Sequence, residues 1–333
     1  MKKVICIALS LMLTAGMLTS CQTPSASKNR GEKLRIVTTI FPEYDWVREI
    51  VGDQADRIEL TMLLDDGVDL HSFQPTANDM VTISNCDLFL YTGGESDSWV
   101  EDALSNPANS RRVALCLMDV LGDAVKAEEM VDGMQETDHH HDHEDEDEHD
   151  HEDHPHDDEH IWLSLKHAAV LCGAIADTLG TIDPDHQNAY AENASAYIQK
   201  LTDLDAQYQT AVEVSPNRTL LFADRFPFRY LADDYGLTYY AAFSGCSAET
   251  EASFETVAFL AGKVDELALP CVLTIEGTTH SIAETVIGNT NAKNQDILML
   301  DSMQAVTAAD VAAGATYLSI MEQNLEALKT ALR

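Results

Sequence analysis

The sequence predicts an α/β protein in which two α/β lobes are joined by one long, rigid helix. Apolar strand-like runs alternate with helical patterns in both halves of the chain, as an α/β fold requires. One uninterrupted helical pattern separates the two halves. The 333 residues suffice for two domains with their own cores. In such folds ligands bind at the carboxyl ends of the strands, where loops of both lobes can face each other across a cleft.

The first lobe is expected over residues 34–182. Four runs in it have the composition of strands, and helical spacing recurs between them. A further helix over 164–179 can begin at Ser164, because a serine hydroxyl is a favoured N-cap. The strands are expected at LRIVTTI (34–40), IELTMLL (58–64), DLFLYTGG (87–94) and RRVALCLM (111–118), with helices around 42–52, 75–85 and 97–105.

The linking helix is expected over residues 183–214. Asp183-Pro184 opens it, since proline is favoured in the first turn of a helix. Apolar residues then recur at helical spacing, as Tyr190, Ala194, Tyr197, Ile198, Leu201, Leu204, Tyr208 and Ala211. The second lobe follows over 215–333, with strands at TLLFAD (219–224), LTYYAAF (237–243), CVLTIEG (271–277) and DILML (296–300).

The first residues have the layout of a secretory signal. Lys2 and Lys3 precede an apolar run over 4–18, and small residues then lead to Cys21. Leu-Thr-Ser-Cys resembles the bacterial lipobox, which implies a signal peptide over 1–20 and a lipid on the thiol of Cys21. The alternative is an ordinary signal peptide with a chance cysteine. Residues 21–33 lack apolar periodicity and are expected to form a flexible tether, so the mature chain would lie outside the cytoplasmic membrane.

The stretch 136–160, ETDHHHDHEDEDEHDHEDHPHDDEH, holds 14 Asp or Glu and nine His among 25 residues. So little apolar content and so much like charge predict that most of it is a mobile surface loop. The whole chain has a formal net charge of −37. Such a charge repels nucleic acid and favours cations. We therefore expect no nucleic-acid partner.

Five cysteines lie beyond Cys6 and Cys21, well separated and without a C-x-x-C pair: Cys86, Cys116, Cys172, Cys246 and Cys271. An odd number cannot pair completely within the chain. Several fall in apolar runs, so we expect mostly buried thiols, with room for one disulfide.

Two histidines fall where a cleft is expected. His71 lies in the loop after the strand at 58–64, and His160 lies between the acidic stretch and the apolar Ile161-Trp162-Leu163. A single histidine in either place is more often a surface or capping residue than a metal ligand. Position alone leaves both interpretations open.

Several ordered motifs resemble one family: the solute-binding proteins of bacterial ABC transporters for zinc and manganese, in the group with a rigid interdomain helix. They are IVTTIFPEYDWVREIVGD (36–53), GVDLHSFQPTANDM (67–80), DLFLYTGGESDSWV (87–100), DEHIWLSLKHA (158–168) and the acidic His-rich insertion before the last of these. The resemblance covers essentially the whole mature chain and implies a metal site in the interlobe cleft.

By this resemblance, His71 and His160 match the first two metal ligands. The family usually places a His or Glu after the first strand of the second lobe, but an ungapped match puts Arg225 there. Arginine cannot be a ligand because its guanidinium stays protonated and has no available lone pair. Asp224 is the obvious substitute, with a salt bridge or a loop cap as its other interpretation.

The fourth ligand position falls in CVLTIEGTTHSIAETV, where His280 lies within one residue of the expected place and Glu276 competes with it. A ligand set that includes His280 favours Zn2+, whereas one with both Asp224 and Glu276 would favour Mn2+ more. The expected ligands are therefore His71, His160, Asp224 and His280. Glu249 and Glu251 could hold the ligand imidazoles in place or simply be solvated.

The resemblance implies a receptor that binds Zn2+, with Mn2+ possible, and delivers it to an ABC permease with its ATPase subunit. We expect a monomer at the cell membrane, anchored on the extracytoplasmic side. The His-rich loop would gather zinc beside the cleft, or would only be a solubilising insert. We expect no enzyme, since H-E-x-x-H and G-x-S-x-G are absent. A manganese receptor, a surface metal buffer or adhesin, and an extracellular metal-dependent hydrolase are the alternatives.

Overall fold

The computed structural model describes residues 33–135, 156–247, 251–277 and 279–333. Leu34–Arg333 forms one compact unit. The signal peptide expected over 1–20, almost all of the tether over 21–33 and most of the His-rich loop over 136–159 lie outside the described residues.

The first lobe contains a four-stranded parallel sheet with strand order β2-β1-β3-β4. Each strand ends before its apolar run does, because the last residues of the run leave the sheet and enter the loops at its carboxyl edge. Thr39, for example, donates its backbone N–H to Glu43 Oε2 at 2.8 Å instead of continuing β1. The strands are β1 (Leu34–Thr38), β2 (Ile58–Met62), β3 (Leu88–Tyr91) and β4 (Val113–Cys116), and the helices are α1 (Phe41–Val51), α2 (Ala77–Asn85), α3 (Val100–Ser105), α4 (Leu117–Leu121) and α5 (Leu165–Ile182).

The second lobe repeats this arrangement with a parallel sheet of strand order β6-β5-β7-β8. The pairing of β5 with β6 shifts register between Phe222 and Arg225, and such an irregularity re-aims the side chains at that point. Its strands are β5 (Thr219–Phe226), β6 (Thr238–Ser244), β7 (Cys271–Thr274) and β8 (Asp296–Met299), and its helices are α7 (Arg229–Tyr235), α8 (Phe254–Leu267), α9 (Ser281–Asn289), α10 (Ala308–Ala312) and α11 (Tyr317–Ala331).

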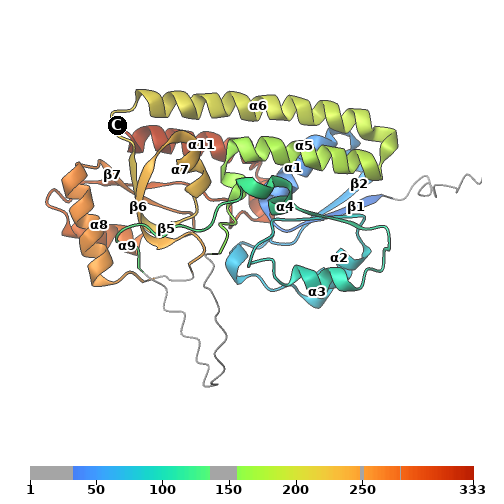
Figure 1. Ribbon diagram of the computed structural model, residues 1–333, viewed down its shortest axis with the longest axis horizontal. Helices are drawn as coiled ribbons and strands as arrows, with labels where there is room; N and C mark the ends of the chain where they lie inside the picture. Colours follow the sequence, from blue (N-terminus) through green and yellow to red (C-terminus); the bar gives the residue numbers. More distant parts are fainter. Residues whose placement is uncertain (1–32, 136–155, 248–250, 278) are drawn as a thin grey trace, which may run out of the picture. The chain divides into compact units, whose positions relative to one another are not determined.

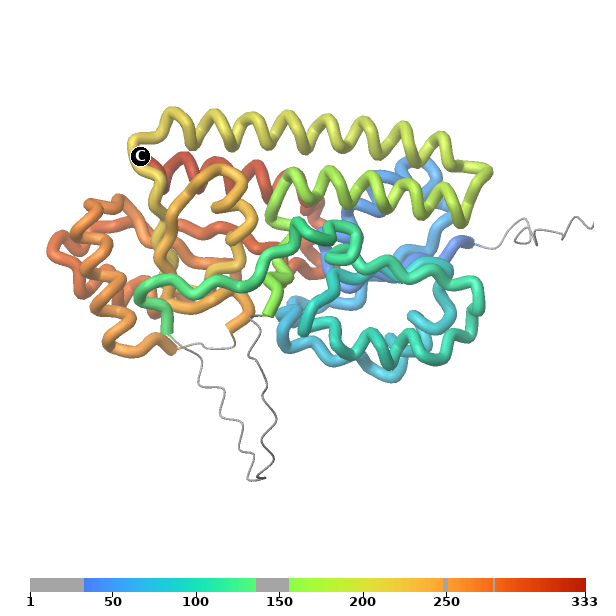
Figure 2. Tube along the Cα trace, in the orientation of Figure 1, coloured from blue at the N-terminus to red at the C-terminus, as the bar shows by residue number. Residues whose placement is uncertain are grey.

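The linking helix α6 (Gln187–Val214) is 28 residues long and runs beside α5 and α11 (Figure 1). It packs on helices of both lobes: α1 and α5 from the first, α7 and α11 from the second. It begins later than predicted, because Pro184–His186 form a 3-10 turn before it. Figure 2 follows the chain from α5 through α6 into the second sheet. The prediction of two α/β lobes joined by a long helix is confirmed, and both sheets are parallel.

Buried hydrogen bonds join the two lobes beneath the carboxyl edges of the sheets. Trp162 Nε1 donates to the carbonyl of Ser302 at 2.8 Å, and Tyr317 Oη donates to the carbonyl of Trp162 at 2.6 Å. The Tyr317 N–H donates to Asp45 Oδ2 at 2.7 Å. The main cluster of buried apolar residues is also continuous from the first sheet through α5 and α6 to β5 and α11. A shared core of this kind resists wide opening of the lobes.

The five cysteines in the described part of the chain are free thiols, and three of them are buried: Cys86, Cys172 and Cys271. The disulfide for which the sequence left room is therefore not formed there. In the same described ranges, no helix combines the length and the apolar character needed to cross a bilayer.

Candidate metal site

His71 is held at the carboxyl edge of the first sheet by a short 3-10 turn, Leu70–Ser72. Leu70 is buried, with 1% of its surface exposed, and anchors the turn. Asp69 Oδ1 accepts the backbone N–H of His71 at 3.0 Å. The Nδ1 atom of the His71 ring lies 2.8 Å from Ser96 Oγ, in the loop after β3. The other ring nitrogen, Nε2, is directed toward His160.

His160 is fully buried, and its orientation is fixed by a neighbouring carboxylate. Asp158 Oδ1 accepts both the backbone N–H and the Nδ1–H of His160, each at 2.9 Å. Asp158 is itself held at its backbone, because its N–H donates to the carbonyl of Lys126 and its carbonyl accepts from Tyr230 Oη. A carboxylate that accepts Nδ1–H leaves the Nε2 lone pair free for a metal, and this is the usual support of a metal-binding histidine.

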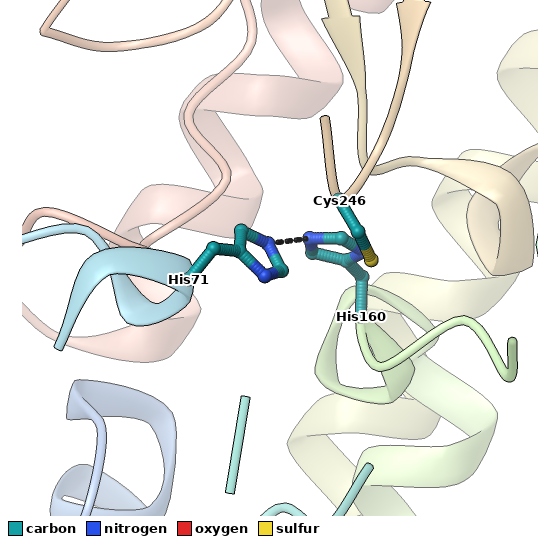
Figure 3. Close-up of side chains that lie close together, drawn as sticks. All are labelled: His71, His160 and Cys246. Atoms are coloured by element: carbon teal, nitrogen blue, oxygen red, sulfur yellow. Dashed lines mark hydrogen bonds between the residues drawn. The ribbon is translucent and has the colours of Figure 1, made fainter. Parts of the chain in front are cut away.

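The two histidine rings point toward each other, with their Nε2 atoms 3.2 Å apart (Figure 3). Two nitrogens bound to one tetrahedral zinc ion at about 2.0–2.1 Å would be separated by roughly 3.3 Å. The spacing therefore fits a pair of imidazoles that share one zinc ion. The structure thus brings His71 and His160 together.

The surroundings give the two rings opposite tendencies toward protonation. Burial, followed by the nearby charge of His160, lowers the pKa of His71 to about 3. Burial also opposes a charge on His160, but the Asp158 carboxylate outweighs it and raises the pKa of His160. His71 is therefore neutral at neutral pH and presents a lone pair toward its partner.

Cys246 places a third side chain that could bind a metal beside these two rings, and the sequence did not indicate it as a ligand. Among the described residues, the ligand atoms of His71, His160 and Cys246 all lie within 4.8 Å of one another. Figure 3 shows the Cys246 sulfur beside the His160 ring, on the loop that follows β6. Burial, together with the carboxylates of Glu128 and Asp158, raises the pKa of the Cys246 thiol. The Cys246 thiol is therefore protonated at neutral pH in the metal-free protein.

Asp224 and Arg225 lie at the carboxyl end of β5, on the opposite wall of the same pocket as His71. Asp224 accepts the backbone N–H of Arg225 at 2.9 Å and that of Ile275 at 3.2 Å, which ties the end of β5 to the end of β7. Arg225 reaches across to the first lobe, where its guanidinium lies 2.6 Å from Asp69 Oδ2. Within the described ranges, the salt bridge of Arg225 is with Asp69 of the first lobe.

His280 lines this pocket, which has a volume of about 400 Å³. It precedes α9 with a left-handed backbone, φ 56°. Its Nδ1 atom is buried and has no hydrogen-bond partner among the described residues. His280 and Asp224 are not members of the cluster formed by His71, His160 and Cys246 in the described ranges. Both belong to the second lobe and line the pocket together with His71.

Glu276, the competing fourth ligand, is engaged elsewhere. Its two carboxylate oxygens accept the N–H and hydroxyl of Ser302 at 2.7 and 2.6 Å and the N–H of Gln304 at 3.0 Å. These bonds fix the loop after β8. Glu251 is exposed, and Glu249 lies outside the described residues.

Known proteins resemble this chain over nearly all of its length. Residues 36–331 match the family model of ZnuA, zinc-uptake complex component A, periplasmic. The high-affinity zinc uptake system protein ZnuA of Bacillus subtilis is 30% identical over 98% of this chain and 96% of its own. The zinc-binding lipoprotein AdcA of Streptococcus pneumoniae is 31% identical over 99% of this chain.

The solved structures agree with the sequence relatives. The Zn(II)-bound ZnuA-like domain of Streptococcus pneumoniae AdcA is 26% identical, with a TM-score of 0.67 over 90% of this chain and 99% of that domain. The chain spans 61% of the length of the AdcA protein that it matches. Two parallel-sheet lobes, a long linking helix and a match over 36–331 lead to one conclusion: the chain belongs to the ZnuA family of zinc-uptake complex components.

Proposed function

We propose that the protein is an extracytoplasmic zinc receptor that delivers Zn2+ to an ABC permease with its ATPase subunit. The observation that carries this proposal is the pair of imidazoles, His71 and His160, whose Nε2 atoms are 3.2 Å apart. Membership of the ZnuA family and the zinc named for its relatives support the choice of metal. Imidazole nitrogen is also a better ligand for zinc than for manganese.

In this proposal the ion binds between the lobes. His71 and His160 hold it on the side of the first lobe, and Asp224 with His280 complete the site from the second lobe. The His280 Nδ1 atom, buried without a partner among the described residues, supports this role. His71, Asp224 and His280 line a pocket that opens toward solvent, and this pocket would be the route of entry.

The zinc ion is cargo in this proposal, so the protein binds and releases it rather than using it for catalysis. Protein ligands from both lobes leave little room for the open position that catalytic zinc requires. The shared core and the buried bond between Trp162 and Ser302 favour exchange of metal through movements of the loops rather than a wide hinge.

The remaining parts of the proposal concern the segments outside the described residues. We propose that a lipid on Cys21 anchors a monomeric receptor to the outer side of the cell membrane, as the lipobox-like sequence indicates. The His-rich loop over 136–159 would collect zinc loosely and raise its concentration near His160. Its eight histidines among carboxylates support this role.

The proposal is tested by competition titration of residues 22–333 with Zn2+ and Mn2+ against a chelator. One tight zinc site should be lost in His71→Ala and in His160→Ala. His186→Ala is the matched control, because His186 contacts Asp183 before α6. If His71→Ala and His160→Ala bind zinc as tightly as the His186 variant, or if manganese binds more tightly than zinc, the proposal is wrong.

A further inference from the structure

We propose that the thiolate of Cys246 is a zinc ligand, alongside His71 and His160, and that it makes the site selective for Zn2+ over Mn2+. This inference rests on the proposed function, which places the ion between the two histidines. It adds a sulfur ligand that neither the resemblance nor the motif spacing indicated. Its basis is the cluster in which the ligand atoms of all three residues lie within 4.8 Å of one another.

The turn that carries Cys246 is packed closely against His160. A Cβ atom on Gly245 would lie 3.0 Å from His160 Cε1 and 3.0 Å from the carbonyl oxygen of Phe226, so a larger residue there would press on the ligand ring. Glycine at this position lets the backbone come close to the imidazole. The sulfur of Cys246, the next residue, therefore lies beside the His160 ring, as Figure 3 shows.

Two further contacts fix this turn. The backbone N–H of Cys246 donates to Glu128 Oε1 at 2.9 Å, and Glu128 belongs to the segment just before the His-rich loop. The carbonyl of Ser247 accepts from Arg225 Nη1 at 3.4 Å. Ser247 is itself buried. Cys246 is therefore placed by neighbours on both sides rather than lying on a loose surface loop.

Arg225 explains why a ligand on this turn is needed. It occupies the place at which the resemblance expects a His or Glu ligand, and its guanidinium cannot bind a metal. Instead it forms an ion pair with Asp69 and contacts Ser247, which is adjacent to Cys246. The end of β5 thus places a cation where the resemblance expects a ligand, and the turn after the neighbouring strand β6 places a thiol near the two histidines.

The donor set has a chemical consequence. Two imidazole nitrogens and one thiolate suit zinc, with a Zn–S bond of about 2.3 Å, and are poor ligands for manganese, which prefers oxygen. On binding, the thiol gives up its proton to solvent as the metal–sulfur bond forms. With Cys246 bound, one position of a tetrahedral site is left, so the thiolate takes the place of either Asp224 or His280 in the proposed ligand set.

The test uses Co2+ as a probe in residues 22–333, because cobalt bound to a thiolate has a sulfur-to-metal charge-transfer band in the near ultraviolet. The wild type should show this band, and Cys246→Ser should lose it. Cys116→Ser is the matched control, since Cys116 is also a half-buried free thiol, with its sulfur directed to the carbonyl of Thr92. The control should keep the band.

Affinities provide the second readout. The total binding free energy of a structural zinc site is shared among four ligands. Loss of one of them should therefore weaken zinc binding about 100-fold. Cys246→Asp keeps a negative ligand but makes it an oxygen, so it should lower the ratio of zinc to manganese affinity.

Three results would overturn the inference. The first is tight cobalt binding that depends on His71 but gives no charge-transfer band. The second is a band that survives Cys246→Ser. Either result would mean that the Cys246 sulfur is not a ligand, while the proposed function would still stand. If the wild type binds neither zinc nor cobalt tightly, the inference and the proposed function fail together.

Discussion

The carboxylate of Asp158 should determine how tightly zinc is held, although it does not touch the ion. It accepts both the backbone N–H and the Nδ1–H of His160 at 2.9 Å and is almost fully buried. Asp158→Asn keeps the size of the side chain and an oxygen that can accept these bonds. It removes the negative charge that makes the imidazole a stronger donor to a metal.

The expected magnitude follows from this role. Substitution of a group that supports a metal-binding histidine typically lowers metal affinity about 10- to 100-fold. That range corresponds to roughly 1.4–2.7 kcal/mol of binding free energy. The effect should fall toward the upper end here, because His160 and Asp158 are both shielded from solvent, which strengthens the interaction of their charges.

The assay is competition of the variant with a chromophoric chelator for Zn2+ at neutral pH, with the thermal unfolding of the metal-free protein as a check of folding. Asp157→Asn is the matched control: it removes the same charge one residue away, from an exposed side chain. Asp158→Asn should bind zinc about 10- to 100-fold more weakly than the wild type, the range typical for groups that support a metal-binding histidine. The zinc affinity of Asp157→Asn should equal that of the wild type. Equal affinities in the two variants would refute the role of Asp158.

Three other predictions concern stability and the metal count. Burial, with the charge of Asp97 adding to it, raises the pKa of Glu43 from 4.5 to about 8. The folded state then binds one more proton than the unfolded state between these values, so the unfolding free energy falls as pH rises through this window. Glu43→Gln should flatten that fall by roughly 1.4 kcal/mol per pH unit in urea denaturation, and an unchanged slope would contradict it. A double-mutant cycle of Arg225→Gln and Asp69→Asn should give a coupling energy of about 1–2 kcal/mol in the metal-free protein; additive effects would mean that the ion pair adds nothing. Removal of residues 137–155, which keeps the backbone pairing of Asp157 with Ala127, should lower the number of bound zinc ions and leave one tight site in calorimetry, whereas loss of that site would tie the loop to it.

Local patterns predicted the fold, and the family resemblance named two of the three residues of the cluster. The alternation of apolar runs with helical spacing located all eight strands of the described residues, since buried parallel strands are continuous apolar runs. The start of α6 was placed too early because proline signals a first turn but not its type, and a 3-10 turn precedes Gln187. His71 and His160 were predictable because each lies in a motif with its own flanking residues.

Cys246 could not be found in this way. Its neighbours, SGCSAET, contain no metal-binding spacing, and its proximity to His160 depends on the end of β6 meeting the segment after the His-rich loop. The small residue Gly245 before it is the one available signal, since glycine often marks a close approach of the backbone. The ion pair between Arg225 and Asp69 likewise joins different lobes, which sequence spacing does not reveal.

Anomalous diffraction at the zinc edge, from crystals of residues 22–333 grown with one equivalent of Zn2+, tests the central claim most directly. One strong peak is expected between the Nε2 atoms of His71 and His160, within bonding distance of both. A structure whose only anomalous peaks lie away from these two rings would contradict the proposed zinc site.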